Sequence, residues 1–235
     1  MTRPPMHLTR ELVDYCFRAE PDLGFDLKYE YWDRNDFEVA VTRLLSQRTE
    51  GPLWIFAYGS LIWRSEHQYA EQKRGTVHGW HRSFCMQLTR WRGTAEQPGL
   101  MMCLVRGGSC EGIAYRLSEE KCRDELFQLL WRELGCEEAF ASVRWVKVRT
   151  ETETLRALTF YARPDRMDTY IGKWPLEKVA HTLARACGHV GSGAEYLYQT
   201  VLKLEENGIH DRNLWRLQKL VASEIGVLRD RSDPQ

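Results

Sequence analysis

The chain has 235 residues, 43% of them hydrophobic and 28% charged, which is typical of a folded globular protein with a sizeable core. Its 33 lysines and arginines balance its 33 aspartates and glutamates, so we expect neither nucleic acid nor an anionic membrane surface as a partner. The longest stretch without charge, residues 51–63, is too short to cross a bilayer. The first residues, MTRPPMHLTREL, contain no apolar run of the kind that a secretory signal has.

The seven cysteines are spaced irregularly and form no CxxC pair, a pattern that indicates neither a disulfide framework nor a zinc site. In "HGWH", His78 and His81 would point to opposite faces of a strand, and no cysteine or carboxylate completes a set of metal ligands. We therefore expect a cytoplasmic protein with reduced thiols and no bound metal.

The N-terminal part of the chain predicts two helices followed by a strand. Thr9 can cap a helix over residues 10–19, which Pro21 ends. Asp36 precedes a second helix, whose apolar side chains fall along one side. Residues 53–58 are apolar, aromatic or branched, which is typical of a buried strand.

The middle of the chain predicts mostly strands. Residues 75–89 alternate loosely between apolar and polar side chains, and the segments on either side of Gly107 and Gly108 predict a hairpin that turns at these glycines. A helix is expected to follow as far as about Leu134, before Gly135. Two more alternating segments predict an antiparallel pair: residues 142–150 and 154–163.

The last third of the chain predicts helices. Ser192 and Glu195 have the spacing of a capping box, and Asp211 can start the final helix. The expected helices cover residues 176–187, 194–207 and 211–226. Because the chain contains no repeats and no low-complexity linker, the order of elements favours an α+β protein with a mostly antiparallel sheet or barrel. We expect residues 1–50 to form a helical extension that packs on a core formed by residues 51–235.

The run "FAYGSL" breaks the predicted buried strand at Gly59 and Ser60. A β-bulge or a tight turn explains the break without any function. Alternatively, successive N–H groups and the Ser60 hydroxyl point into a concavity that holds a carboxylate or a phosphate. The sequence has no GxGxxG or GxxxxGK[ST] motif, so a small carboxylate ligand fits better than a nucleotide.

Six segments, in order, resemble the ChaC-type γ-glutamylcyclotransferases, a resemblance that extends roughly over residues 53–201. They are "FAYGSLIW", "LTRWRGTAEQPG", "GGSCEGIAYRL", "LLWRELG", "YIGKWPLEKVA" and "GHVGSGAEYLYQTV". The family cuts glutathione into 5-oxoproline and cysteinylglycine without a metal or an organic cofactor. The resemblance thus implies a γ-glutamylcyclotransferase-like fold: a mixed, mostly antiparallel β-barrel flanked by helices.

The resemblance also implies a set of substrate-binding residues. The γ-glutamyl site would be lined by Ala57, Tyr58, Gly59, Ser60, Leu61 and Ile62. The strand would break there to expose amides to the α-carboxylate of the substrate, and then return to bury Leu61 and Trp63. Arg92 resembles a family arginine that would bind a substrate carboxylate or hold the loop, and a structural salt bridge explains it at least as well.

Ring closure needs a group that removes a proton from the α-amine and gives one to the leaving nitrogen, and a single carboxylate can do both. In the family the essential glutamate follows an arginine late in a helix, which corresponds here to Glu133 after Arg132. A family "GxY" segment appears as Glu138-Ala139-Phe140, so Glu137 or Glu138 are alternative candidates, ranked after Glu133.

The sequence therefore predicts a glutathione-specific γ-glutamylcyclotransferase with a small-molecule substrate. The same ring closure on another γ-glutamyl amine or dipeptide is an alternative. A third reading is a non-catalytic protein, related to cation-transport regulation, that senses a γ-glutamyl compound in the same cleft.

Overall fold

A computed structural model describes residues 5–24, 28–49, 51–64 and 69–232, and the remaining residues lie outside the described part. The chain divides into two compact units. Unit 1 comprises Met1–Gly24, Ser83–Cys103 and Thr169–Gln235, and unit 2 comprises Phe25–Arg82 and Leu104–Asp168. The predicted extension, residues 1–50, contributes to both units. The proposed boundary between residues 50 and 51 stays a prediction, and parts of both segments lie outside the described residues.

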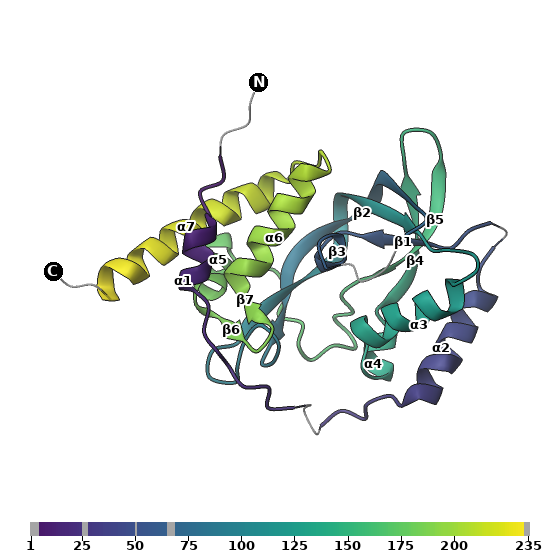
Figure 1. The fold of residues 1–235 in the computed structure, drawn as a ribbon, viewed down its shortest axis with the longest axis horizontal. Coiled ribbons are helices and arrows are strands. Elements are labelled where there is room, and N and C mark those ends of the chain that lie inside the picture. Colours follow the sequence, from purple (N-terminus) through teal and green to yellow (C-terminus); the bar gives the residue numbers. More distant parts are fainter. Residues whose placement is uncertain (1–4, 25–27, 50, 65–68, 233–235) are drawn as a thin grey trace. The chain divides into compact units, whose positions relative to one another are not determined.

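Five strands form a closed barrel in the order β1-β3-β2-β4-β5 (Figure 1). They are β1 (Trp54–Ala57), β2 (Glu71–Leu88), β3 (Gly99–Arg116), β4 (Val143–Arg149) and β5 (Thr154–Phe160). β1 runs antiparallel to β3 and parallel to β5, whereas β4 runs antiparallel to both β2 and β5. This arrangement confirms the predicted mixed, mostly antiparallel barrel. β1, β4 and β5 lie wholly in unit 2, with the first part of β2 and the second part of β3.

The predicted strand at 53–58 is β1, whose four side chains are all buried. A strand that pairs with a neighbour on both sides and is buried along its whole length has no face left for water, which explains the continuous apolar run. The predicted pair of alternating segments forms β4 and β5, which pair without a gap from Val143↔Phe160 to Arg149↔Thr154.

The hairpin predicted at Gly107 and Gly108 is wrong, because β3 continues through both residues as one strand. Both glycines have positive φ, 106° and 68°, a conformation that suits a bulge inside a strand as well as a reversal of the chain. Nδ1 of His81, on β2, lies 2.9 Å from the Gly107 carbonyl oxygen, so this part of β3 lies beside β2.

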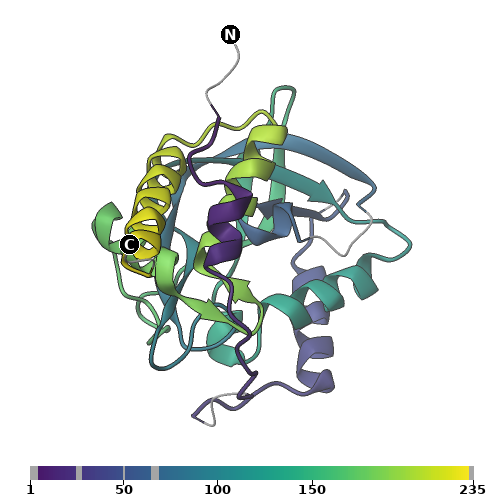
Figure 2. The ribbon, with the colours of Figure 1, turned by 60° about the vertical axis from the view of Figure 1, so that its left-hand side comes forward.

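The described residues of unit 2 form three α-helices: α2 (Arg34–Ser46), α3 (Cys122–Glu133) and the short α4 (Glu137–Phe140), which the sequence did not predict. α2 begins earlier than expected, because Asp33 is the N-cap and Asp36 completes a reciprocal capping box. α2 packs against α3 (Figures 1 and 2). The contact is aromatic: the centroid of the Phe37 ring on α2 lies 4.9 Å from that of Trp131 and 6.0 Å from that of Phe127, both on α3.

The part of unit 1 that the structure describes contains four helices and a small two-stranded sheet. The helices are α1 (Arg10–Tyr15), α5 (Leu176–Arg185), α6 (Gly193–Glu206) and α7 (Arg212–Ser232), and the strands are β6 (Cys187–Gly188) and β7 (Gly191–Ser192). α5 packs on α6 and α7, and α1 packs on the same two helices (Figures 1 and 2). Leu183, Leu197 and Val221 are fully buried at this junction of helices.

The caps of these helices were predictable, whereas several of their ends were not. Thr9, Ser192 and Asp211 accept hydrogen bonds from backbone N–H groups at the starts of α1, α6 and α7, as predicted. α1 ends four residues early, at Tyr15, and α5 ends two residues early, at Arg185. α7 continues past Gly226, because a single glycine lowers helix stability by only about 1 kcal/mol.

None of the described helices is both long enough and apolar enough to cross a membrane.

Candidate functional site

The segment that follows β1 turns sharply instead of continuing as a strand. A single 3-10 turn, η1 (Ser60–Ile62), follows Gly59. Its hydrogen bonds use the N–H groups of Ile62, Trp63 and Arg64, which donate to the carbonyls of Gly59 and Ser60. The first N–H groups of a helical turn have no partner inside the turn. Those of Ser60 and Leu61 are therefore oriented outward from its start.

Burial divides the predicted γ-glutamyl residues into two groups. Ala57, Tyr58, Leu61 and Ile62 are buried, and Ser60 is half-buried. The apolar run thus returns to the core at Leu61 as expected, but as a helical turn, and Trp63 is only half-buried. Gly59 has a φ of −141°, outside the left-handed region, so a positive φ is not the reason for glycine there.

Two contacts from neighbouring strands position β1 directly before this turn. The hydroxyl of Thr159, on β5, is fully buried and donates to the Phe56 carbonyl at 2.9 Å. On β3, Gly112 approaches β1 so closely that an added Cβ would lie 2.3 Å from the Ala57 carbonyl oxygen. The glycine of the "EGIAYRL" segment is therefore needed for the close approach of the two strands.

Glu133 is the last residue of α3, in the same unit as η1. Only 22% of its side chain is exposed. Burial raises the pKa of the Glu133 carboxyl above its ordinary value of 4.5, while the positive charges of Arg132 and then Arg64 lower it. A raised pKa in a partly buried carboxyl is characteristic of a group that exchanges protons.

The two alternative carboxylates have a different environment. Glu137 and Glu138 lie in the first turn of α4 and are both exposed. Exposed carboxylates at a helix start are ordinary surface residues, favoured there by the helix dipole. Of the three glutamates, Glu133 is thus the one whose surroundings differ from those of a solvated side chain.

The structure also reveals two residues that sequence reasoning did not select for the site. The Arg132 guanidinium lies 3.2 Å from Glu133 through Nε, and its Nη1 donates to the carbonyl of Arg64, just beyond η1. This contact connects the end of α3 to the segment that follows the 3-10 turn. The pairing of Arg132 with Glu133 in "WRELG" was the available signal, but the role of Arg64 had none.

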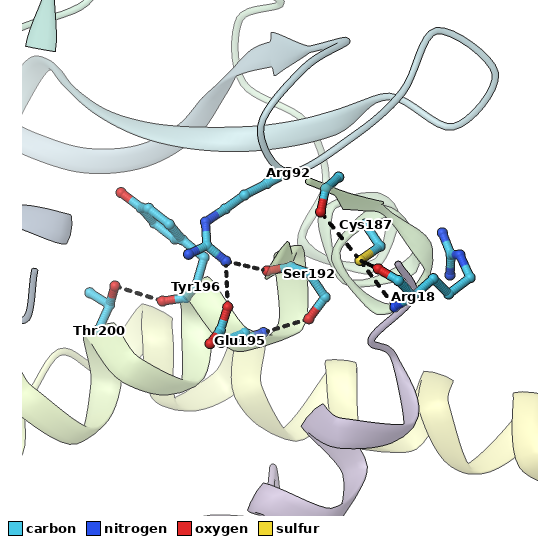
Figure 3. A network of polar contacts seen from close by, with 8 residues as sticks. Arg18, Arg92, Cys187, Ser192, Glu195, Tyr196 and Thr200 are labelled. Atoms are coloured by element: carbon cyan, nitrogen blue, oxygen red, sulfur yellow. Dashed lines mark hydrogen bonds and ion pairs between the residues drawn. The ribbon is translucent and has the colours of Figure 1, made fainter. Parts of the chain in front are cut away.

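Arg92 lies in unit 1, where it forms a buried ion pair (Figure 3). Its Nη1 donates to Glu195 Oε2 at 2.9 Å and to the Ser192 carbonyl at 2.8 Å. Its guanidinium also lies over the Tyr196 ring, 5.4 Å from the centroid. These contacts secure the β7–α6 junction and agree with the salt-bridge explanation, so a role in substrate binding stays a prediction.

Possible metal ligands do not gather anywhere in the described parts of the chain: no three His, Cys, Asp or Glu side chains are placed to hold one ion.

Comparison with known proteins defines the class to which this barrel and turn belong. Residues 53–224 match the family of ChaC-like proteins. The chain is 39% identical over 229 residues to a protein of Escherichia coli K12 named glutathione-specific gamma-glutamylcyclotransferase, covering 92% of this chain and 96% of that one. It is 30% identical to gamma-glutamylcyclotransferase 2-3 of Arabidopsis thaliana, over 72% of this chain and 88% of the relative.

Solved structures agree on the fold. A crystal structure of a yeast γ-glutamyl cyclotransferase specific to glutathione matches with a TM-score of 0.65 at 20% identity, covering 74% of this chain and 97% of the yeast chain. The class is therefore that of γ-glutamylcyclotransferase-like barrels. Within it, the chain belongs to the ChaC-like family.

Proposed function

We propose that this protein is a glutathione-specific γ-glutamylcyclotransferase, which converts glutathione to 5-oxoproline and cysteinylglycine. The similarity to the E. coli relative of that name, over 96% of the relative's length, carries the proposal. The partly buried Glu133, in the same unit as the turn after β1, supports it.

In the proposed reaction, the α-amine of the γ-glutamyl group attacks its own γ-carbonyl carbon. A carbon–nitrogen bond closes the five-membered ring, and the bond from that carbon to the cysteinyl nitrogen breaks. The α-ammonium gives up as many protons as the leaving nitrogen gains, so Glu133 can shuttle them with no net consumption of water or acid. Because both reacting groups belong to one substrate molecule, holding it in a ring-like pose supplies a large part of the acceleration.

Substrate binding is proposed to use the turn after β1. The outward N–H groups at the start of η1, with the Ser60 hydroxyl, would accept the α-carboxylate, while Ala57, Tyr58, Leu61 and Ile62 shape the apolar wall. Arg92 is proposed separately, either as a contact for a substrate carboxylate or as a residue that holds its own loop. Its ion pair with Glu195 supports the second, structural role.

We further propose that the protein works in the cytoplasm. All seven cysteines are buried thiols rather than disulfides, which suits a reducing compartment.

The test is a direct assay. The purified protein is incubated with glutathione, and 5-oxoproline and cysteinylglycine are quantified by liquid chromatography and mass spectrometry. γ-Glutamyl dipeptides, which lack the C-terminal glycine of glutathione, serve as comparison substrates. Equal amounts of both products are expected from glutathione. If only another γ-glutamyl compound is turned over, that compound replaces glutathione as the proposed substrate. If glutathione binds but no products form, the non-catalytic sensor is favoured.

Glu133→Gln is expected to abolish turnover with the fold intact, because the amide cannot accept the proton. Glu137→Gln and Glu138→Gln are matched controls on the neighbouring exposed carboxylates and should keep wild-type turnover. Full activity in Glu133→Gln would move the catalytic role to one of these two residues.

A further inference from the structure

The side chain of Arg132 lies between two parts of the proposed active site. Its Nε is 3.2 Å from Glu133 Oε1, and its Nη1 donates to the Arg64 carbonyl. Only 20% of the Arg132 side chain is exposed, so most of this side chain contacts protein rather than water. One planar group therefore connects the proposed base to the backbone just beyond η1.

This pairing is unusual for neighbours in sequence. Consecutive residues of a helix point about 100° apart and do not face each other. Glu133 is the last residue of α3, and Leu134 already has an extended conformation, with φ −122° and ψ 164°. The carboxylate thus lies where regular helix geometry ends, and the helix alone does not fix its direction.

The backbone beyond Glu133 is held by hydrogen bonds that do not involve the Glu133 side chain. The N–H of Trp32 donates to the Gly135 carbonyl at 2.8 Å, and the Leu134 N–H donates to the Leu130 carbonyl at 2.8 Å. These bonds hold the main chain at the end of α3. Among the described residues, the ion pair that fixes the Glu133 carboxylate itself is the one with Arg132.

We propose that Arg132 is a positioning residue for the ring-closure reaction, holding the Glu133 carboxylate in a fixed place relative to the backbone that follows η1. The inference rests on the proposed function. A guanidinium suits this task because its planar fork can reach a carboxylate and a carbonyl at once, whereas a lysine ammonium is a point charge. The positive charge has a second effect: the charges of Arg132 and then Arg64 lower the pKa of the partly buried Glu133 carboxyl, so it stays ionised at lower pH than burial alone would allow.

The experiment compares Arg132→Gln and Arg132→Lys with the wild type. Arg132→Gln should lower kcat about tenfold or more at neutral pH, with KM changed less than about threefold, because positioning and ionisation of the base act on the chemical step. The acidic limb of its pH–kcat profile should move to higher pH. Arg132→Lys should restore the position of that limb, since the charge returns. Its kcat should stay below wild type, because one ammonium cannot both pair with the Glu133 carboxylate and donate to the Arg64 carbonyl as the guanidinium does.

Arg123→Gln is the matched control on the same helix. Arg123 donates to Glu38 at 2.7 Å and to Thr42 at 3.1 Å, with 48% of its side chain exposed. Its loss removes an arginine hydrogen-bond pair of α3 without touching Glu133, so kcat and the pH profile should equal those of the wild type. Thermal melts of all variants report whether folding is preserved. Should Arg132→Gln fail to fold, Arg132→Lys alone carries the comparison.

A substrate-free measurement separates this inference from the proposed function. NMR of carboxyl-labelled glutamate, assigned by difference with Glu133→Gln, follows the titration of Glu133 directly. Wild-type turnover combined with an unchanged kcat and an unchanged Glu133 titration in Arg132→Gln would overturn the role of Arg132 alone. No turnover in the wild type, with an upward-shifted titration in Arg132→Gln, would overturn the proposed function and leave the control of the carboxylate by Arg132 standing.

Discussion

Replacing Gly112 with alanine should weaken both the fold and the site. The added Cβ would lie 2.3 Å from the Ala57 carbonyl oxygen and 2.7 Å from Cζ of Phe56, whose side chain is fully buried. The first of these atoms is backbone, so β1 or β3 has to shift by several tenths of an ångström. Overpacking of this kind costs about 1–3 kcal/mol. For a chain of this length, that corresponds to a fall in Tm of roughly 2–12 °C.

Because Ala57 is the last residue of β1 before the turn, the same shift should displace the N–H groups that we propose for the substrate carboxylate. A displacement near 1 Å can cost about a hundredfold in rate, so kcat should fall between about tenfold and a hundredfold. Differential scanning calorimetry and the glutathione assay measure the two effects.

Gly226→Ala is the matched control for this substitution. An added Cβ at Gly226 meets nothing within 4 Å, and the residue lies inside α7. Its replacement should therefore raise Tm by roughly 2–4 °C, because alanine is favoured over glycine in a helix by about 1 kcal/mol. A Gly112→Ala protein with wild-type Tm and kcat would refute the idea that this glycine sets the approach of β3 to β1.

Four further predictions concern charge and capping. Because burial raises the Glu133 pKa and the base must be ionised, kcat/KM should rise with pH along a limb above pH 4.5, and a limb at or below that value would contradict the assignment. A carboxyl whose pKa is higher in the folded than in the unfolded protein stabilises the fold at low pH, and this contribution is lost as the pH rises through the pKa of the folded state. At pH 8 the Tm of Glu133→Gln should therefore be no lower than that of the wild type. Arg92→Met should cost about 1–3 kcal/mol in urea unfolding because it leaves Glu195 unpaired, whereas Lys203→Met, at an exposed pair on α6, should cost at most about 1 kcal/mol. Asp211→Ala should cost about 1 kcal/mol by the same measurement through loss of the α7 cap, and an unchanged midpoint would refute the capping role.

Local chemistry explains why some elements could be predicted from the sequence. The apolar run at β1, the alternation in β4 and β5, and the caps at Thr9, Ser192 and Asp211 each depend on residues within one element. The hairpin expected at Gly107 failed because a positive φ serves a bulge and a turn equally, and only the neighbouring strand decides between them. The start of α2 was ambiguous for a similar reason, since both aspartates of a reciprocal capping box look like caps.

The site depended more on contacts that are distant in sequence. That a glutamate follows an arginine in "WRELG" is visible in the sequence, but the burial of Glu133 depends on how the chain folds around the end of α3. The hydrogen-bond partners of Arg92, Ser192 and Glu195, lie 100 and 103 residues away in the sequence. The sequence therefore suggested a salt bridge of Arg92 as one explanation for this residue but could not identify the partner. The Thr159 hydroxyl, 103 residues from Phe56, had no signal at all.

β2 and β3 each run through a border between the two compact units, at residues 82–83 and 103–104, without interruption of the strand. One unit is assembled from three stretches of the polypeptide and the other from two. No single protease cut, and no shortened gene, can therefore release either of them whole and by itself. Deleting the first fifty residues would remove α1 from one unit and α2 from the other, so a truncation at this end damages both units.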